Sequence, residues 1–593
     1  MTYSAPVSEI DFLLRKVAGL DELAAEAGFA AAFPNYDSEL VHPILEEAGK
    51  LAGEILAPIN ASGDQAGSTL GDAGVVAAPG FKDAYGSYLD AGWMGLGFPE
   101  AYGGQGLPKG LALAVMEMIH GANMSFGLAP MLSFGAVEAL LEHGTPQQQD
   151  MYLPKLVSGE WTGTMNLTEP QAGSDVGALK ARAVPNGDGS YAITGQKIYI
   201  TWGDHDLTEN IIHLVLARVP DAPEGSRGVS LFLVPKVIVG EDGGLGDANA
   251  VKCIGLEKKV GIHASPTCVM EYTQATGWLI GEENKGLAHM FTMMNSARVN
   301  VGLEGVGVGE AAYQTAFAYA QERKQGAAAG VSGPAPILHH ADVRRTLTTM
   351  RARVMAARAI CYATGIAADR ARIGEDEDAR AAAKAREDLL TPIAKAWSTD
   401  MGVDVASMGV QIHGGMGFMD ETLAAQLYRD ARIGPIYEGT NGIQAIDLIG
   451  RKVFRDGGTA MGAMIADIRD TARDARSTNE SALVHVAERL DVATDALQSA
   501  TDWIVETMGA DRETALAGAT AYLALAGDVI GGHFLTRGAV LSRNETTATR
   551  SVMAALASYY ADTALAEAPG QVAAVTKSGK HVLEGSEALF ALT

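Results

Sequence analysis

The chain has 593 residues, of which 47% are hydrophobic and 20% are charged. It is too long for one hydrophobic core, so we expect several domains with the composition of an ordinary globular protein. The formal net charge of −26 disfavours nucleic acid and anionic membranes as partners, because both are negatively charged.

The cysteine pattern and the N-terminal residues exclude further classes of protein. Cys253, Cys268 and Cys361 form no Cys-x-x-Cys pair, and no His/Cys cluster has zinc-ligand spacing. We therefore expect no metal site. We expect the three cysteines to be small buried thiols in a reducing compartment. The first residues lack a basic patch followed by an apolar run, which predicts no signal peptide. The apolar stretch 106–141 is interrupted by Glu117, which predicts no membrane span, and we expect a cytoplasmic protein.

The first part of the chain, residues 1–160, is predicted to be a helical domain with an N-terminal extension. Within residues 37–56, Leu40, Ile44 and Leu51 recur at helical spacing with glutamates between them. This pattern is typical of a helix that buries one face.

After residue 160 the hydrophobic period changes, and residues 161–280 are predicted to form a small β domain. Residues 185–189, Pro-Asn-Gly-Asp-Gly, are a strong turn signal. Residues 191–201 then alternate between apolar and polar as a strand does. Residues 213–219 and 228–237 are further strand candidates, so the segment favours a middle β barrel.

Helices return near Lys285 and dominate onward. Residues 341–363 and 376–409 are predicted to be long helices. An Ala/Gly/Pro-rich loop at 326–336 separates them from the helix that begins near Lys285. We expect residues 281–455 to form a C-terminal helical bundle.

Residues 455–458 are predicted to be a linker before an Ala-rich tail. Residues 456–593 are predicted to be an additional helical domain, with one helix at 483–508. The predicted fold class is therefore mainly α with a central β domain.

Two short segments carry candidate chemistry. Residues 413–417, His-Gly-Gly-Met-Gly, let backbone N–H groups approach a phosphate, but such a run also simply closes a helix. No strand precedes it, so it does not fit the dinucleotide-binding fingerprint. Glu438 is interpreted either as a solvated loop residue or as a carboxylate whose pKa apolar neighbours raise, which would make it a general base.

Two other segments also allow two interpretations. Residues 168–175, Thr-Glu-Pro-Gln-Ala-Gly-Ser-Asp, are either a connection or a loop that presents polar groups to a ligand at the domain junction. Met290, Met293 and Met294 lie at helical spacing, which favours core packing over a flexible pocket lining.

Taken together and in this order, these segments resemble the acyl-CoA dehydrogenase family over residues 35–455. The family fold is an N-terminal helical domain, a middle β barrel and a C-terminal four-helix bundle. The extra residues after about 456 resemble a longer subgroup of the family. The matching segments are 168–175, 195–201, 322–324, 411–415 and 436–440.

The resemblance implies FAD as the cofactor and an acyl-CoA thioester as the substrate. Glu438 matches the family's catalytic glutamate, and Arg323 matches an arginine that reaches the FAD of a neighbouring subunit. The implied FAD contacts are Leu167, Thr168, Tyr199, Thr201, Arg323, Gln411, Gly414, Gly415 and Thr440. The implied substrate contacts are Ser174, Arg298 and Gly439.

The chain departs from the family pattern at three places. Tyr199 stands where the family most often has Trp. Gln325 and Gly326 follow Lys324 where many members have Thr-Phe-Gly, which puts an adenine contact in doubt. Some members carry the base just before the arginine that Arg298 matches. Here that residue is Ala297, which cannot take a proton, so Glu438 has no rival.

The implied reaction is α,β-dehydrogenation to a trans-2-enoyl-CoA. Glu438 would remove the α-proton while a hydride leaves for flavin N5. The resemblance favours 3-methylmercaptopropionyl-CoA, oxidised to methylthioacryloyl-CoA, or a short- to medium-chain acyl-CoA as the substrate. The implied partners are an electron-transferring flavoprotein as acceptor and further copies of the chain in a homodimer or homotetramer.

Three alternatives stay open at this point. They are a long-chain acyl-CoA dehydrogenase, an acyl-CoA oxidase that passes electrons to oxygen, and a non-catalytic, nucleic-acid-binding relative of the alkylation-response type. The last needs a basic tail, whereas this tail contains Glu488, Asp491, Asp495 and Asp502.

Overall fold

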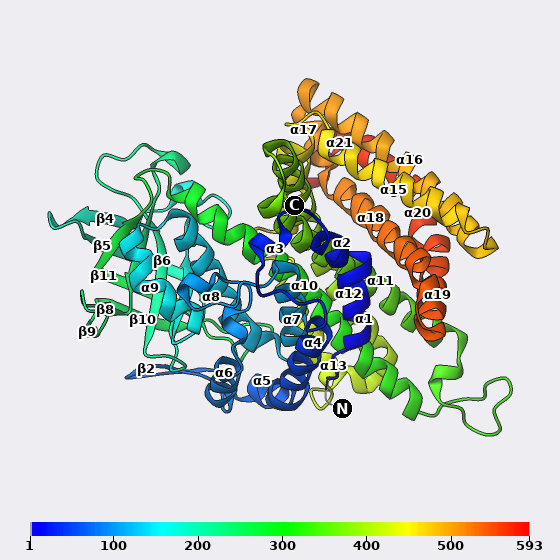
Figure 1. Ribbon diagram of the computed structural model, residues 1–593, viewed down its shortest axis with the longest axis horizontal. Coiled ribbons are helices and arrows are strands. Elements are labelled where there is room, and N and C mark those ends of the chain that lie inside the picture. Colours follow the sequence, from blue (N-terminus) through cyan, green and yellow to red (C-terminus); the bar gives the residue numbers. More distant parts are fainter. Residues whose placement is uncertain (1–2, 592–593) are drawn as a thin grey trace.

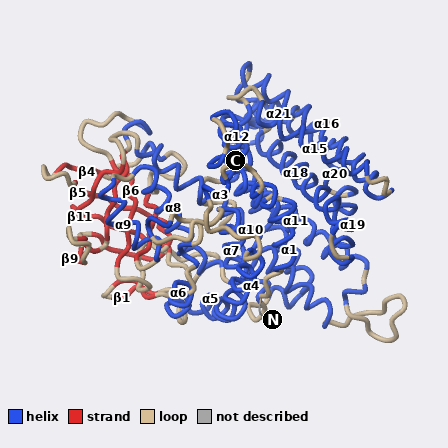
Figure 2. The backbone as a smooth tube through the Cα atoms, in the orientation of Figure 1, coloured by secondary structure: helices blue, strands red, loops and turns tan. Residues whose placement is uncertain are grey.

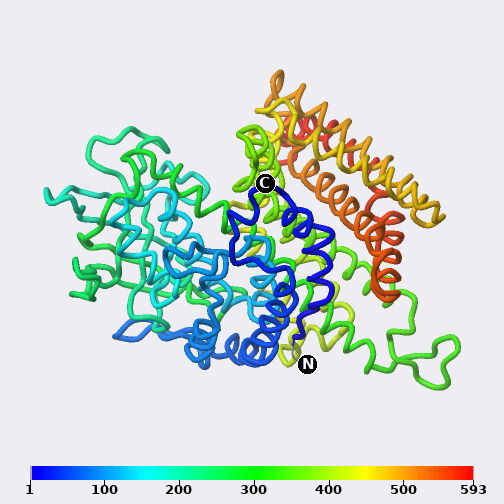
Figure 3. Tube along the Cα trace, viewed as in Figure 1, coloured from blue at the N-terminus to red at the C-terminus, as the bar shows by residue number. Residues whose placement is uncertain are grey.

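A computed structural model describes residues 3–591 (Figure 1). The strands gather at one side of the molecule, and the remainder is helical (Figure 2). Following the chain in Figure 3, the N-terminal helices lead into the β region. The chain then returns through long central helices to a separate layer of C-terminal helices. Met1, Thr2, Leu592 and Thr593, which belong to the first and last predicted domains, lie outside the described residues.

The N-terminal part is helical, as predicted, apart from one small hairpin that the sequence did not indicate. The helix expected at 37–56 begins later, at Val41, and passes into a π-helical turn over Leu51–Leu56. The helices are α1 (Val7–Phe12), α2 (Leu20–Ala24), α3 (Phe29–Ala32), α4 (Val41–Lys50), α5 (Asn60–Ala66), α6 (Phe81–Asp90), α7 (Lys109–Ala122), α8 (Met124–His143) and α9 (Pro146–Ser158), and the hairpin is β1 (Thr69–Gly71) with β2 (Gly74–Val76).

Helix α8 is the one helix within residues 3–591 that is long and apolar enough to cross a membrane by length and composition. Its most apolar window is 83% buried inside the protein. The helix therefore has the surroundings of a core helix.

The middle region forms one large sheet with the order β3-β6-β7-β11-β5-β4, and β10 pairs with β11. β3 and β6 are parallel, and the other pairs are antiparallel. A bridge between Arg182 and Arg218 brings β4 back to the end of β6, so the sheet curls toward a barrel. The strands are β3 (Trp161–Asn166), β4 (Arg182–Pro185), β5 (Tyr191–Thr201), β6 (Asn210–Ala217), β7 (Ser230–Pro235), β8 (Val237–Val239), β9 (Leu245–Ala248), β10 (Val251–Leu256) and β11 (Thr267–Ile280).

The central helices are α10 (Gly286–Glu322), α11 (Ala341–Ile373), α12 (Glu377–His413), α13 (Leu423–Ala431) and α14 (Asn441–Asp447). The predicted strand 191–201 has the bounds of β5, whereas the two long predicted helices run on to Ile373 and His413. A Cβ atom at Gly302 would lie 2.5 Å from the carbonyl oxygen of Ala394, so a larger residue could not sit where α10 meets α12.

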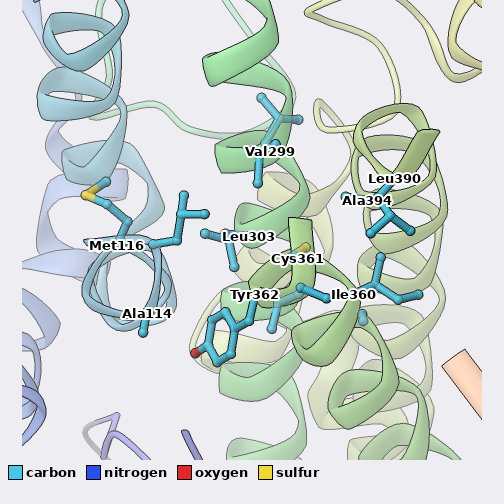
Figure 4. Packing of buried hydrophobic residues seen from close by; sticks show 14 of the residues in the cluster. Ala114, Met116, Val299, Leu303, Ile360, Cys361, Tyr362, Leu390 and Ala394 are labelled. Carbon is cyan, nitrogen blue, oxygen red and sulfur yellow. The ribbon is translucent and has the colours of Figure 1, made fainter. Parts of the chain in front are cut away.

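One continuous core joins the N-terminal helices to the central bundle (Figure 4). Met116 of α7, Leu303 of α10 and Tyr362 of α11 belong to it, and Figure 4 shows them among their neighbours. Inside this core, the fully buried Arg358 of α11 donates hydrogen bonds of 2.8 Å to Glu117 of α7 and to Glu310 of α10. This ion cluster ties three helices from two parts of the chain together.

The C-terminal layer packs on the bundle through α18. Gly527 of α18 lies against the indole ring of Trp397, where a methyl group would collide with the ring. The Trp397 Nε1 donates to Asp528 at 3.1 Å. The helices of this layer are α15 (Thr459–Ser477), α16 (Ser481–Ala510), α17 (Arg512–Ala517), α18 (Ala519–Leu541), α19 (Thr547–Asp562), α20 (Ala564–Thr576) and α21 (Ser578–Phe590).

Candidate active site

Glu438 lies in the turn between α13 and α14. Its φ of 56° is left-handed, a conformation that costs an ordinary L-residue about 1–2 kcal/mol. Gly439 follows with a φ of 81°, which glycine adopts readily. Thr440 then caps α14, because its hydroxyl accepts a hydrogen bond of 3.3 Å from the Ile443 N–H. A glutamate held in such a conformation is a hint of function.

Two buried side chains hold this turn from beneath. Lys395 of α12 donates from Nζ to the Gly439 carbonyl and to the Asn441 side-chain oxygen, both at 2.9 Å. Gln444 of α14 donates to the Glu438 carbonyl at 3.0 Å. Neither Lys395 nor Gln444 was predicted from the sequence. For Lys395 the sequence did contain a signal of a special role. This lysine lies inside the apolar run 389–397, and a lysine is rarely buried unless it is paired.

The electrostatic surroundings make Glu438 a candidate base near neutral pH. Burial raises the pKa of its carboxyl to about 7, and the nearby charges of Arg298 and Lys395 act in the opposite direction. Arg298 is itself buried and lies 3.6 Å from Asp447 of α14. A carboxyl group with a pKa near the working pH is well suited to accept a proton from a weakly acidic C–H bond.

In the β region, a buried ion pair fixes the loop that begins with Leu167 and Thr168. Lys197 of β5 donates to the Leu167 carbonyl at 3.0 Å and to the Glu169 carboxylate at 2.8 Å. The carbonyl of Thr168 accepts from the Ile198 N–H at 2.9 Å. Glu169 and Lys197 were not among the predicted site residues, yet they place the predicted ones beside β5.

A β-bulge in β5 sets the direction of the Tyr199 side chain. Between Lys197 and Ile200 the register of β5 against β11 slips, and Tyr199 takes a left-handed φ of 60°. Such bulges redirect a side chain out of the regular alternation. The Tyr199 side chain is 59% exposed, and the half-buried Thr201 lies two residues on. An exposed aromatic ring on a strand that also carries Thr201 and pairs with Thr168 fits the flat, polar ring system of a flavin.

The structure does not bring all predicted site residues together. Ser174 lies exposed in the loop between β3 and β4, and the described contacts do not join it to Glu438. Gly439 and Arg298 are close, because a Cβ atom at Gly439 would lie 3.9 Å from an Arg298 nitrogen. The β-region residues form one group, and Glu438, Gly439, Thr440 and Arg298 form a second.

A third group lies at the far ends of α10 and α12. The rings of Tyr319 and His413 stack with centroids 4.4 Å apart, so the two helices end side by side. Arg323 therefore leaves α10 near Gln411, in the last turn of α12, and near the following turn that holds Gly414 and Gly415. This turn is a short 3-10 helix over Gly414–Phe418, whereas the sequence indicated a loop.

The third group is distant from the second within one chain. At 1.5 Å per residue, the end of α10 is about 36 Å along the helix from Arg298. A Cβ atom at Gly414 or Gly415 would meet nothing within 4 Å, so this turn is open to an incoming group.

One cavity, of 490 Å³, is not part of these groups. It is lined by helices α7, α8, α10 and α11, with Thr292, Ser296 and Asn300 facing it from α10. At 100° per residue these three positions point away from Arg298. Among residues 3–591, no three His, Cys, Asp or Glu side chains are arranged to hold a metal ion.

Comparison with protein-family models shows four consecutive matches. They are "Acyl-CoA dehydrogenase, N-terminal domain" at residues 43–160, "Acyl-CoA dehydrogenase, middle domain" at 164–275, "Acyl-CoA dehydrogenase, C-terminal domain" at 284–454 and "Acetyl-CoA dehydrogenase C-terminal like" at 464–585. Together they cover most of the chain.

Similar proteins extend this result to the whole length. The chain is 44% identical to 3-methylmercaptopropionyl-CoA dehydrogenase of Ruegeria pomeroyi, covering 99% of this chain and 100% of that protein. It is 35% identical to the broad-specificity linear acyl-CoA dehydrogenase FadE5 of Mycobacterium tuberculosis, covering 79% and 78%. An acyl-CoA dehydrogenase of Bacillus anthracis, solved with FAD, shares the fold with a TM-score of 0.74 at 22% identity, covering 97% and 95%.

Proposed function

The chain belongs to the acyl-CoA dehydrogenase family, and we propose that it oxidises 3-methylmercaptopropionyl-CoA together with short- to medium-chain acyl-CoA thioesters. As a member it is an FAD-dependent oxidoreductase that acts on CH–CH groups. The observation that carries the chemistry is Glu438, half-buried in a left-handed turn with its pKa raised to about 7.

In the proposed reaction, Glu438 accepts the proton from the α-carbon of the acyl chain. FAD, when bound, supplies the acceptor for the hydride that leaves the β-carbon. The hydroxyls of Thr168 and Thr201 and the ring of Tyr199 would hold the flavin. Lys197 and Glu169 keep that surface in place.

The negative charge that develops on the thioester oxygen needs a donor. The left-handed residues Glu438 and Gly439 form a turn whose backbone N–H groups can serve an oxyanion. We assign this role to the N–H of Glu438. Arg298 stays beside the base, where its charge favours the ionised carboxylate and can attract the CoA part of the substrate.

The substrate assignment rests on the full-length similarity to the Ruegeria pomeroyi protein. It is tested by anaerobic flavin reduction with 3-methylmercaptopropionyl-, butyryl-, octanoyl- and palmitoyl-CoA. We expect the first two to bleach the flavin fastest. Reduction by palmitoyl-CoA alone would contradict the short-chain assignment, and the absence of reduction by all four would contradict the proposed function.

We propose an electron-transferring flavoprotein as the electron acceptor. The similar proteins are dehydrogenases, which does not favour the oxidase or the nucleic-acid-binding alternative. The reduced enzyme is mixed either with oxygen or with an electron-transferring flavoprotein under anaerobic conditions. Rapid reoxidation by oxygen with release of hydrogen peroxide would instead identify an oxidase.

We further propose a cytoplasmic homo-oligomer. Arg323 and the turn at Gly414 lie about 36 Å along α10 from Arg298. We therefore infer that these residues contact the cofactor of a second copy of the chain, as the family resemblance implies for Arg323. Phe418 on the same turn is 83% exposed, and Met416 and Met419 are more than 40% exposed. Apolar side chains gathered on one turn are typical of a contact between subunits.

A further inference from the structure

A second carboxyl group lies behind the candidate base and has no part in the reaction described so far. Glu304 of α10 is 1% exposed. The hydroxyl of Tyr437 donates a hydrogen bond to Glu304 Oε2, while Oε1 has no hydrogen-bond partner within residues 3–591. Tyr437 directly precedes Glu438, so Glu304 is one side chain removed from the base.

The charged and polar groups that act on Glu304 come from α12 and from the turn after α13. Lys395 faces it from α12, while Tyr437 and Glu438 face it from the turn after α13. The charge of Asp430, on α13, acts on Tyr437. Burial raises the pKa of Glu304 to about 8, and burial lowers the pKa of Lys395 to about 8.

An ionised Glu304 would disfavour the ionisation of Glu438. Two carboxylates in one buried region disfavour each other's ionisation, so a second negative charge would push the pKa of Glu438 upward. A neutral carboxyl group still offers an oxygen to the Tyr437 hydroxyl. It therefore holds the tyrosine without adding charge near Glu438.

We propose that Glu304 is a positioning residue for proton transfer, a protonated acid that anchors Tyr437 and thereby fixes the left-handed turn that presents Glu438. This inference rests on the proposed function, because it assigns a task within the same reaction. It also predicts that a second ionisation, that of Glu304, perturbs the reaction above the ionisation of Glu438.

The test compares three variants in stopped-flow flavin reduction by an acyl-CoA. Glu304→Gln keeps a neutral oxygen for Tyr437, Glu304→Leu removes it, and Tyr437→Phe removes the hydroxyl. Tyr313→Phe is the matched control, since Tyr313 lies on α10 but packs against Phe317.

At pH 7 we expect Glu304→Gln to react within twofold of the wild type. Glu304→Leu and Tyr437→Phe should each be about tenfold slower, as for one lost hydrogen bond in a buried site. Combining them should add little, because both remove the same contact. A wild-type rate in Glu304→Leu would overturn the proposal.

The pH profile separates positioning from a merely structural role. The wild type should show a second ionisation near pH 8 that Glu304→Gln lacks. Lys395, whose pKa burial lowers to about 8, is the rival source of this ionisation. If the second ionisation persists in Glu304→Gln, it belongs to the lysine, and the assignment to Glu304 is refuted.

A measurement that needs no substrate turnover tests the role of Glu304 separately from the proposed function. Infrared difference spectra between pH 7 and pH 9 should contain the loss of two protonated carboxyl bands in the wild type, one from Glu438 and one from Glu304, and Glu304→Gln should lack only the Glu304 band. If no acyl-CoA reduces the flavin but this band is present, the substrate assignment fails while the protonated Glu304 stands. If the band is unchanged by the substitution, the Glu304 proposal fails whatever the enzyme oxidises.

Discussion

Replacing Glu438 with glutamine removes the base and preserves the shape of the side chain. With a pKa of about 7, the carboxylate should be about one-tenth ionised at pH 6, half at pH 7 and nine-tenths at pH 8. The rate of flavin reduction in the wild type should follow this fraction. The amide cannot accept a proton, so Glu438→Gln should be slower by about 10⁴-fold.

The same substitution should change stability in a pH-dependent way. The folded-state pKa is raised above the ordinary value of 4.5, so the favourable contribution of the protonated group is complete below pH 4.5. It is lost as pH rises to about 7, because the unfolded chain ionises first. After allowance for partial exposure, Glu438→Gln should gain about 2 kcal/mol over the wild type at pH 8 and nothing at pH 4.

The assay is anaerobic stopped-flow reduction of the bound flavin, with thermal unfolding measured at pH 4 and pH 8. Glu421→Gln, an exposed glutamate on the turn before α13, is the matched control. It should leave both the rate and the pH dependence of stability unchanged. Flavin reduction by Glu438→Gln at more than a tenth of the wild-type rate would refute the assignment of the base.

Two further substitutions test the cofactor surface and the assembly. Lys197→Met leaves the buried Glu169 carboxylate without its cation, so we expect a loss of about 3–5 kcal/mol in unfolding free energy. Flavin should also be released, which absorbance after gel filtration measures; a variant with full flavin content contradicts the role given to this ion pair. Phe418→Glu places a charge on the exposed apolar turn and should shift the protein toward monomers in sedimentation, whereas an unchanged mass would place the subunit contact elsewhere.

Much of the fold could be predicted because local patterns were strong. The alternation in residues 191–201 marks β5, and the apolar spacing after Lys285 marks the long central helices. Helix ends were harder to predict, since α11 and α12 continue past the point where their apolar spacing fades. Contacts with neighbouring helices, which are absent from a local pattern, stabilise those last turns.

The candidate site divides in a similar way. The sequence by itself determined the family resemblance, the candidate base Glu438 and the residues of the flavin loop, because these lie in short segments with a recognisable order. Only the tertiary structure decided that Lys395 and Glu304, distant in the chain, stand beneath that base. It also decided that the turn at Gly414 lies far along α10 from it. Burial and partner choice set the pKa of a carboxyl group, and both depend here on contacts between residues that lie 44 to 133 positions apart in the sequence.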